Sequence, residues 1–259
     1  MNKNYTTTLQ EISSRFFKSN IVTYDEIPMY KSYEEDEELV FETDEFISFE
    51  NFSKQLLCKN FIIDDMVYAK VMLVPCDFNN DKTFMYKAYE AIMEIIDEIK
   101  FNIPDIIKTG LDLFDFDIRI YSDFNYNRLI KDDSNNLGQF DPNKKTISIR
   151  LTPDSKQNIT TLHHEIGHFI DFVNGFDSVT EYSDYASSDD DRIFEAFSNE
   201  VWSLRSYAKK SRQEFFAVAY EYKMTGGDME DLEFTDNAIF HYFKEFITKV
   251  NLIKNLGLQ

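Results

Sequence analysis

The sequence predicts an α+β protein in which a small sheet of mixed or antiparallel strands packs against several helices. Two observations support this fold class. Short stretches alternate apolar and polar residues, as strands do, and longer stretches repeat apolar residues at steps of three and four, as amphipathic helices do. The 259 residues are 43% apolar and 29% charged, a composition typical of a soluble globular protein.

Strands and helices can be placed in order along the first part of the chain. A first helix is expected over 6–18, a strand over 38–49, and one strand or a pair of strands over 61–74. Apolar residues then recur at helical steps from Thr83 to Phe101, which predicts a strongly amphipathic helix.

Helices dominate the expected second part. After Pro104 we expect a short helix to Leu113, a strand over 116–121, a polar, turn-prone segment over 132–145 and a half-exposed strand over 146–151. Four further helices are expected at 159–173, 193–204, 211–224 and 237–256.

The charge balance excludes some classes of partner. The net charge of −20 arises from 47 acidic and 27 basic residues, so the average surface repels nucleic acid and anionic membranes and tolerates cationic partners. We interpret the acidic runs at 34–38 and 189–191 as solvated faces. Cys58 and Cys76 lack the spacing of a metal site and are either one disulfide or two thiols. Residues 1–20 do not resemble a secretory signal, and no apolar stretch is long enough to span a membrane.

The segment His164-Glu165-Ile166-Gly167-His168 carries the clearest chemical signal. Histidines four residues apart on a helix project from one face, so both imidazoles reach one metal ion. Glu165 is rotated by about 100° around the helix, which suits a general base acting on a water molecule better than a ligand. The motif therefore predicts two ligands and a base.

A site of this kind needs a third protein ligand, and the local sequence offers several candidates for it. The pattern with a third downstream histidine is absent, because Asp171 and Asn174 stand where its glycine and histidine would be. His241 lies far downstream, among residues that look like packing. Glu214 opens a helix and is the best carboxylate, but Ser211 and Glu214 also form a capping box. Both interpretations of Glu214 stay open on local grounds.

Two more polar residues lie on the same helix. His163 faces away from the histidine pair by about 100°, so we expect it behind the ligands or facing solvent. Asp171 shares part of the face of His164 and His168 and either orients an imidazole or faces solvent.

The motif resembles a known family of metallopeptidases. The stretch His164 to Asp171, Tyr207, and the run Glu214-Phe215-Phe216-Ala217 are similar to the catalytic domain of anthrax lethal factor and to the clostridial Pro-Pro endopeptidases. In that family a tyrosine precedes the ligand glutamate by seven residues, as Tyr207 precedes Glu214. The resemblance covers roughly 80–259, and Ile166 stands where the family has phenylalanine or leucine.

The resemblance implies a zincin-like fold with one catalytic zinc ion. His164, His168 and Glu214 would hold the metal, Glu165 would activate water, and Tyr207 would donate to the developing oxyanion. It implies a zinc-dependent endopeptidase acting on a protein or peptide substrate, with 79–259 as the catalytic domain. Residues 1–78 would be an accessory or recognition region, or extra layers on the same core.

Three biological settings fit this family. One is a bacterial toxin that cleaves a host protein, with a delivery partner and an acidic surface that favours a basic peptide. The second is a secreted proline-directed endopeptidase acting on bacterial surface proteins, and the third is a docking module without catalysis. In each setting the protein is bacterial and is secreted or delivered to a host cell.

Overall fold

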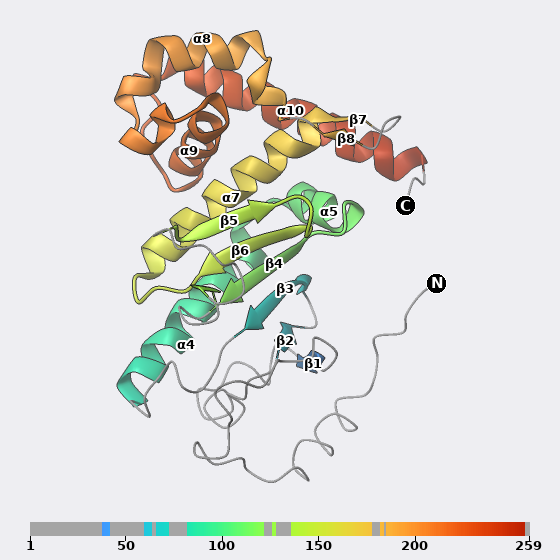
Figure 1. The fold of residues 1–259 in the computed structure, drawn as a ribbon, viewed down its shortest axis with the longest axis vertical. Coiled ribbons are helices and arrows are strands. Elements are labelled where there is room, and N and C mark those ends of the chain that lie inside the picture. The colour runs from blue at the N-terminus through green and yellow to red at the C-terminus, as the bar shows by residue number, and fades with distance from the viewer. Residues whose placement is uncertain are drawn as a thin grey trace.

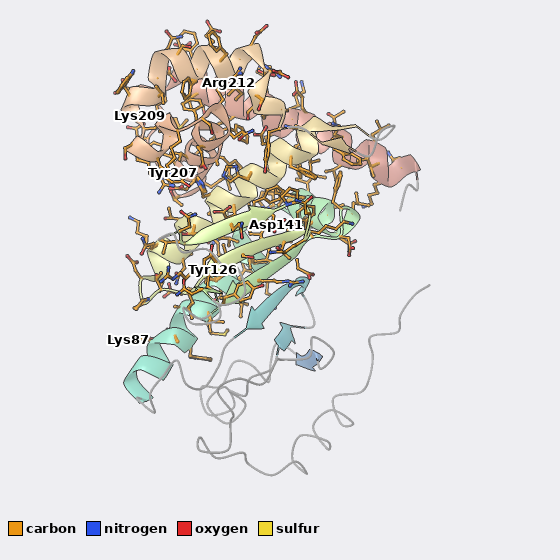
Figure 2. The ribbon with its side chains drawn as sticks, in the orientation of Figure 1. Lys87, Tyr126, Asp141, Tyr207, Lys209 and Arg212 are labelled. Carbon is orange, nitrogen blue, oxygen red and sulfur yellow. The ribbon has the colours of Figure 1, made fainter. Side chains whose placement is uncertain are left out.

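The computed structural model describes residues 38–41, 60–63, 66–72, 82–121, 126–127, 136–177, 182–183 and 185–256. Figure 1 shows the fold of these residues, and Figure 2 adds their side chains. The helix expected over 6–18 and most of the strand expected over 38–49 lie outside the described residues.

A six-stranded mixed sheet forms one side of the molecule, in the order β1-β2-β3-β4-β6-β5. Its strands are β1 (Glu38–Phe41), β2 (Asn60–Ile63), β3 (Met66–Met72), β4 (Asp117–Tyr121), β5 (Gly138–Asp141) and β6 (Thr146–Arg150). The pairs β1/β2, β3/β4 and β4/β6 are parallel, and the pairs β2/β3 and β5/β6 are antiparallel. The α+β class with a mixed sheet is confirmed, as are the strand pair within 61–74 and the strands near 116–121 and 146–151.

Two features of the sheet differ from the sequence predictions. The segment 132–145, predicted to be polar and turn-prone, forms a turn over 142–145 but also contains β5, which pairs antiparallel with β6 through main-chain hydrogen bonds that do not need an apolar pattern. The strand over 146–151 was expected to be half exposed, yet Thr146, Ile147, Ser148 and Ile149 are all buried. Because these residues alternate between the two faces, both faces of β6 are covered.

The described α-helices match six of the predicted segments closely. They are α4 (Lys82–Asp97), α5 (Asp105–Leu113), α7 (Ser155–Gly175), α8 (Asp191–Glu200), α9 (Arg212–Met224) and α10 (Glu233–Leu256). The helix expected over 83–101 finishes in a π-helical turn, Glu98–Asn102. The one expected over 193–204 gives way to a 3₁₀ turn, Val201–Ser203. Helices α7 and α10 each begin four residues before the expected 159 and 237.

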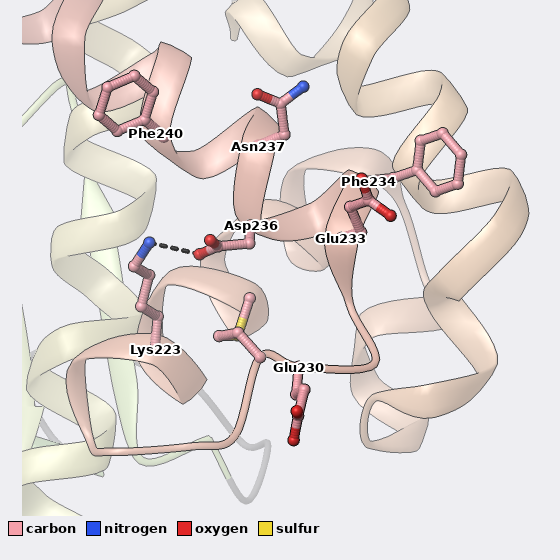
Figure 3. Close-up of a pocket in the computed structure, with 8 residues that line it drawn as sticks. Lys223, Glu230, Glu233, Phe234, Asp236, Asn237 and Phe240 are labelled. Atoms are coloured by element: carbon pink, nitrogen blue, oxygen red, sulfur yellow. Dashed lines mark hydrogen bonds and ion pairs between the residues drawn. The ribbon is translucent and has the colours of Figure 1, made fainter.

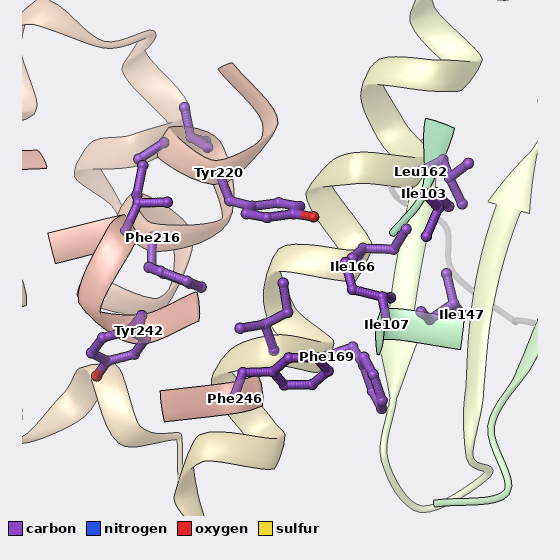
Figure 4. Packing of buried hydrophobic residues seen from close by; sticks show 14 of the residues in the cluster. Ile103, Ile107, Ile147, Leu162, Ile166, Phe169, Phe216, Tyr220, Tyr242 and Phe246 are labelled. Carbon is purple, nitrogen blue, oxygen red and sulfur yellow. The ribbon is translucent and has the colours of Figure 1, made fainter. Parts of the chain in front are cut away.

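Helix α7 lies between the sheet and the C-terminal helices (Figure 4). Asp154 caps its N-terminus by accepting a hydrogen bond from the Gln157 amide. Ile166 and Phe169 are fully buried in the core that also contains Ile147 of β6 and Phe246 of α10. Since side chains on every face of α7 are buried, this is a central core helix rather than a surface helix.

The sheet contains strands from both sides of residue 78, where the sequence predicts a division of the chain. Strand β3 pairs with β4 from Ala69 opposite Ile118 to Met72 opposite Tyr121. Strands from both sides of residue 78 thus belong to one sheet, while the roles expected for 1–78 and 79–259 stay predictions. Within the described residues, no helix is both long and apolar enough to cross a membrane.

Helices α7 and α9 approach each other most closely at Gly167. A Cβ atom built there would lie 2.8 Å from the Cα atom of Ala217, a distance that real Cβ atoms essentially never show. Glycine is therefore required at this crossing, because the obstacle is main chain and cannot rotate away.

We expect Gly167→Ala to destabilise the protein by about 1–3 kcal/mol through overpacking, despite the roughly 1 kcal/mol by which alanine favours an isolated helix. Urea unfolding of the metal-free chain measures this loss. The double variant Gly167→Ala/Ala217→Gly should stay destabilised, because removing the Ala217 side chain leaves the Cα atom in place. An unchanged or higher unfolding free energy for Gly167→Ala would contradict the packing described here.

Candidate metal centre

Three potential ligands converge where α7 and α9 meet. His164 and His168 lie one turn apart on α7, with ring centroids 4.9 Å apart and ring planes nearly perpendicular. The Oε2 atom of Glu214 on α9 lies 3.2 Å from Nε2 of His164 and 3.5 Å from Nε2 of His168. One ligand atom from each of the three residues lies within 4.8 Å of the other two. The group is therefore able to hold one metal ion.

The start of α9 explains how Glu214 reaches the histidines. Ser211 caps the helix, since its Oγ atom accepts a hydrogen bond from the Glu214 amide at 3.1 Å. The Glu214 side chain does not turn back to complete a capping box and lies beside His164 and His168 instead. Only the Ser211 half of the capping box is formed, so the carboxylate is free for another role.

The electrostatics of the three residues fit a bound cation. Burial alone lowers the pKa of His164, but the adjoining carboxylates of Glu214 and Glu221 outweigh it and raise that pKa to about 9. Burial alone raises the pKa of Glu214, but the two histidines outweigh it and hold the pKa well below its usual range. Glu214 Oε2 is buried, lies 3.2 Å from Nε2 of His164 and accepts no well-directed hydrogen bond from a described residue. A metal ion bound here would replace the histidine proton as the partner of this oxygen.

Glu165 lies beneath the edge strand β5. Its side chain is buried, and this burial raises the pKa of its carboxyl group, against the effect of His164 and His168. A Cβ atom on Gly138 would lie 2.6 Å from Glu165 Oε1, so glycine at this position lets the strand main chain approach the carboxylate. A carboxylate with a raised pKa near this group is suited to accept and return a proton.

Tyr207 lies on the other side of His164. The two rings meet edge to face, with centroids 5.6 Å apart. Burial, followed by the charges of Glu214 and Glu165, raises the pKa of Tyr207 to about 12. Its hydroxyl therefore stays protonated at neutral pH and is available as a hydrogen-bond donor.

The remaining sequence candidates lie elsewhere. His163 is buried, and its Nε2 atom is 2.6 Å from Oε1 of Glu98, so of its two expected positions, behind the ligands or facing solvent, the second is wrong. Asp171 is also buried and accepts hydrogen bonds from the Ser187 amide at 2.7 Å and from the Ser187 hydroxyl at 2.5 Å. It fixes the segment before α8 rather than facing solvent. His241 stands outside the ligand group, beside Phe240.

Sequence reasoning missed two residues behind the ligands, Glu221 and Arg205. Glu221 Oε2 lies 3.2 Å from Nδ1 of His164, and Arg205 forms an ion pair with that same oxygen. A carboxylate that accepts from Nδ1 fixes the ring orientation and leaves Nε2 for a metal ion. The spacing offered a clue, because Glu221 follows Glu214 by seven residues and so lies on the same helix face two turns later.

A hollow of about 700 Å³ lies elsewhere, between the end of α9 and the start of α10 (Figure 3). Lys223 and Asp236 form an ion pair at its wall. Its lining contains no histidine or cysteine, so it offers none of the chemistry found at the histidine pair.

Comparisons with known proteins assign no family to the chain. No protein-family model matches the chain, and no curated protein matches it either. The chemistry of the site is therefore inferred from the geometry and surroundings of five residues, His164, Glu165, His168, Tyr207 and Glu214.

Metal binding should release a proton. His164, with a pKa of about 9, is protonated at pH 7 in the metal-free chain, whereas a metal ligand must be neutral. The apparent affinity for Zn²⁺ should therefore rise from pH 7 to 9, about tenfold per unit. Calorimetry at pH 7 in buffers of different ionisation enthalpy should detect about one proton released from His164. An affinity that is constant from pH 7 to 9 would contradict this protonation state.

Loss of the carboxylate behind His164 should weaken the site without removing a ligand. We expect Glu221→Gln to lower the affinity for Zn²⁺ by about 10- to 100-fold, measured by competition with a chromophoric chelator. Glu230→Gln makes the same change at an exposed position on the loop after α9 and should leave the affinity unchanged. Equal affinities for both variants would show that Glu221 does not orient His164.

Proposed function

We propose that this protein is a zinc-dependent endopeptidase of the glutamate-ligated zincin type, similar to the lethal factor family. The observation that carries the proposal is the convergence of Glu214 with His164 and His168, from two helices, beside the buried Glu165. Two imidazoles and one carboxylate are the protein ligands of catalytic zinc in peptidases of this type.

Zinc, when bound by these three residues, would polarise the scissile carbonyl and lower the pKa of a water molecule. The chain's own groups would move the protons. Glu165 would take a proton from the attacking water and pass it to the nitrogen of the leaving amine as the peptide C–N bond breaks. The Tyr207 hydroxyl would donate a hydrogen bond to the oxygen of the scissile carbonyl as negative charge develops on it.

The edge strand β5 offers a place for the substrate main chain. Strand β6 lies between β4 and β5 and is not an edge of the sheet. Among the described strands β5 is the last at this end of the sheet, and its main chain at Gly138 lies against Glu165. A peptide paired with β5 would therefore run past the proposed base.

Among the alternatives, a docking module without catalysis is the one that the site disfavours. A module that had lost its chemistry would have no need to keep the three ligands, the base and the tyrosine. Whether the substrate is a host protein or a proline-containing bacterial surface protein is a question of cleavage sites, which a proteome-derived peptide library answers.

Replacement of the base separates metal binding from catalysis. We expect Glu165→Gln to retain stoichiometric zinc and to lose peptidase activity by at least about 10²-fold, since general-base catalysis contributes about 10²–10⁴. Metal analysis and cleavage of the peptide library measure the two effects on the same preparation. Glu195→Gln, at an exposed position on α8, should keep both properties. Full activity in Glu165→Gln, or an absence of bound metal in the unmodified chain, would refute the proposal.

A further inference from the structure

The segment 202–213 differs in charge from the rest of the chain. It contains Arg205, Lys209, Lys210 and Arg212 and no acidic residue, although the chain as a whole has a net charge of −20. We call these four residues the cationic rim. Such a local reversal of sign concentrates anionic groups at one place on a surface that otherwise repels them.

Aromatic rings lie beside all four rim cations, with the Arg205 guanidinium 5.8 Å from the ring centroid of Tyr207. Lys209 Nζ lies 4.1 Å from the ring centroid of Trp202, and Lys210 Nζ lies 3.5 Å from that of Tyr207. The Arg212 guanidinium lies 5.8 Å from the ring centroid of Phe194. These contacts position the cations before a ligand arrives, which lowers the entropy lost on binding.

The two lysines are available for a partner. Lys209 and Lys210 are exposed, and neither forms an ion pair with any residue that the structure describes. Arg205 differs, because its charge is paired with the buried carboxylate of Glu221. Trp202 is 76% exposed, more than any other large apolar side chain that the structure describes. The rim therefore presents two lysines without an ion-pair partner among the described residues, beside the largely exposed ring of Trp202.

The rim borders the candidate metal centre. Lys210 contacts the ring of Tyr207, and that ring contacts the ring of His164. Figure 2 shows Tyr207 and Lys209 on the same side of the C-terminal helical part, above the sheet that carries Asp141. A polypeptide that reached the histidines from this side would pass Lys210, which Lys209 precedes in the chain.

We propose that Lys209 and Lys210, together with Trp202, bind an acidic segment of the polypeptide substrate next to the bond that is cleaved. The proposal rests on the proposed peptidase function and names its substrate class. An acidic segment is the opposite of the basic peptide that the net charge of the chain favours. Charges are screened over short distances, so the cations close to the bound segment act on it more strongly than the average charge of the surface. A nucleic acid fits poorly, since its extended phosphate backbone would also meet the acidic remainder of the surface.

Cleavage of matched peptides tests the proposal. In the zinc-loaded chain, a peptide cleaved in the library is compared with versions carrying Glu or Gln at each position within four residues of the cleaved bond. We expect the Glu version to have the higher kcat/KM at one or more positions on one side of that bond, by roughly two- to tenfold at low salt, and the ratio to approach one at high salt.

Two variants with the same change in net charge locate the effect. Lys209→Gln/Lys210→Gln should abolish the preference for Glu, whereas Lys87→Gln/Lys254→Gln, at exposed positions on α4 and α10, should preserve it. The absence of a preference, or its equal loss in both variants, would overturn the proposal and leave the proposed peptidase function intact.

A binding measurement keeps the proposal testable if no peptide is cleaved. Fluorescence anisotropy compares a labelled ten-residue peptide of alternating Glu and Ala with its Gln counterpart and with a single-stranded ten-nucleotide DNA, using the full chain. Tighter binding of the Glu peptide, lost in Lys209→Gln/Lys210→Gln only, supports an acidic polypeptide partner even without peptidase activity. Equal binding of the Glu and Gln peptides, or tighter binding of the DNA, would overturn it.

Discussion

The close crossing of α7 and α9 at Gly167 and Ala217 determines the geometry of everything around the candidate metal centre. Because Gly167 has no side chain, the two helices approach until only main chain separates them, and Glu214, less than one turn before Ala217, comes within 3.2 Å of His164. A larger residue at 167 would move α9 outward and separate the carboxylate from the histidines. The same crossing brings Glu221, one turn after Ala217, against the far side of the His164 ring. One glycine thus sets the relation of a potential ligand and of its supporting carboxylate to the same imidazole.

Burial of charge is the second feature that unites this site. His164, Glu165, Glu221 and Asp171 are all buried, which is costly unless each charged group has a partner. Glu221 is paired with Arg205, and Asp171 accepts two hydrogen bonds from Ser187. In the metal-free chain the partners of Glu214 Oε2 are the histidines, with Nε2 of His164 at 3.2 Å and Nε2 of His168 at 3.5 Å. A divalent cation held by the three residues would take over this role, because ligand histidines are neutral and no longer compensate the carboxylate.

The surroundings of the site are divided between two elements with different roles. Below the histidines, the edge strand β5 places its main chain against Glu165 and offers hydrogen-bonding groups that do not depend on side-chain identity. Above them, the segment 202–213 presents Lys209, Lys210 and Trp202, whose side chains can discriminate between partners. A peptide held between these elements would have its direction set by the main chain of β5 and its composition selected by the rim.

Sequence alone determined the features that depend on local periodicity. The face shared by His164 and His168, the cap at Ser211 and the positions of the main helices follow from residue spacing, because a helix places residues three and four apart side by side whatever surrounds it. Tertiary structure decided between the two local interpretations of Glu214, added Glu221 behind His164, and showed that β5 is an edge strand and that His163 and Asp171 are buried. It also brought Arg205 and Lys210 next to the surroundings of His164, in a chain with a net charge of −20. These features depend on contacts between segments tens of residues apart, and the pattern of any single segment does not determine which other segment packs against it.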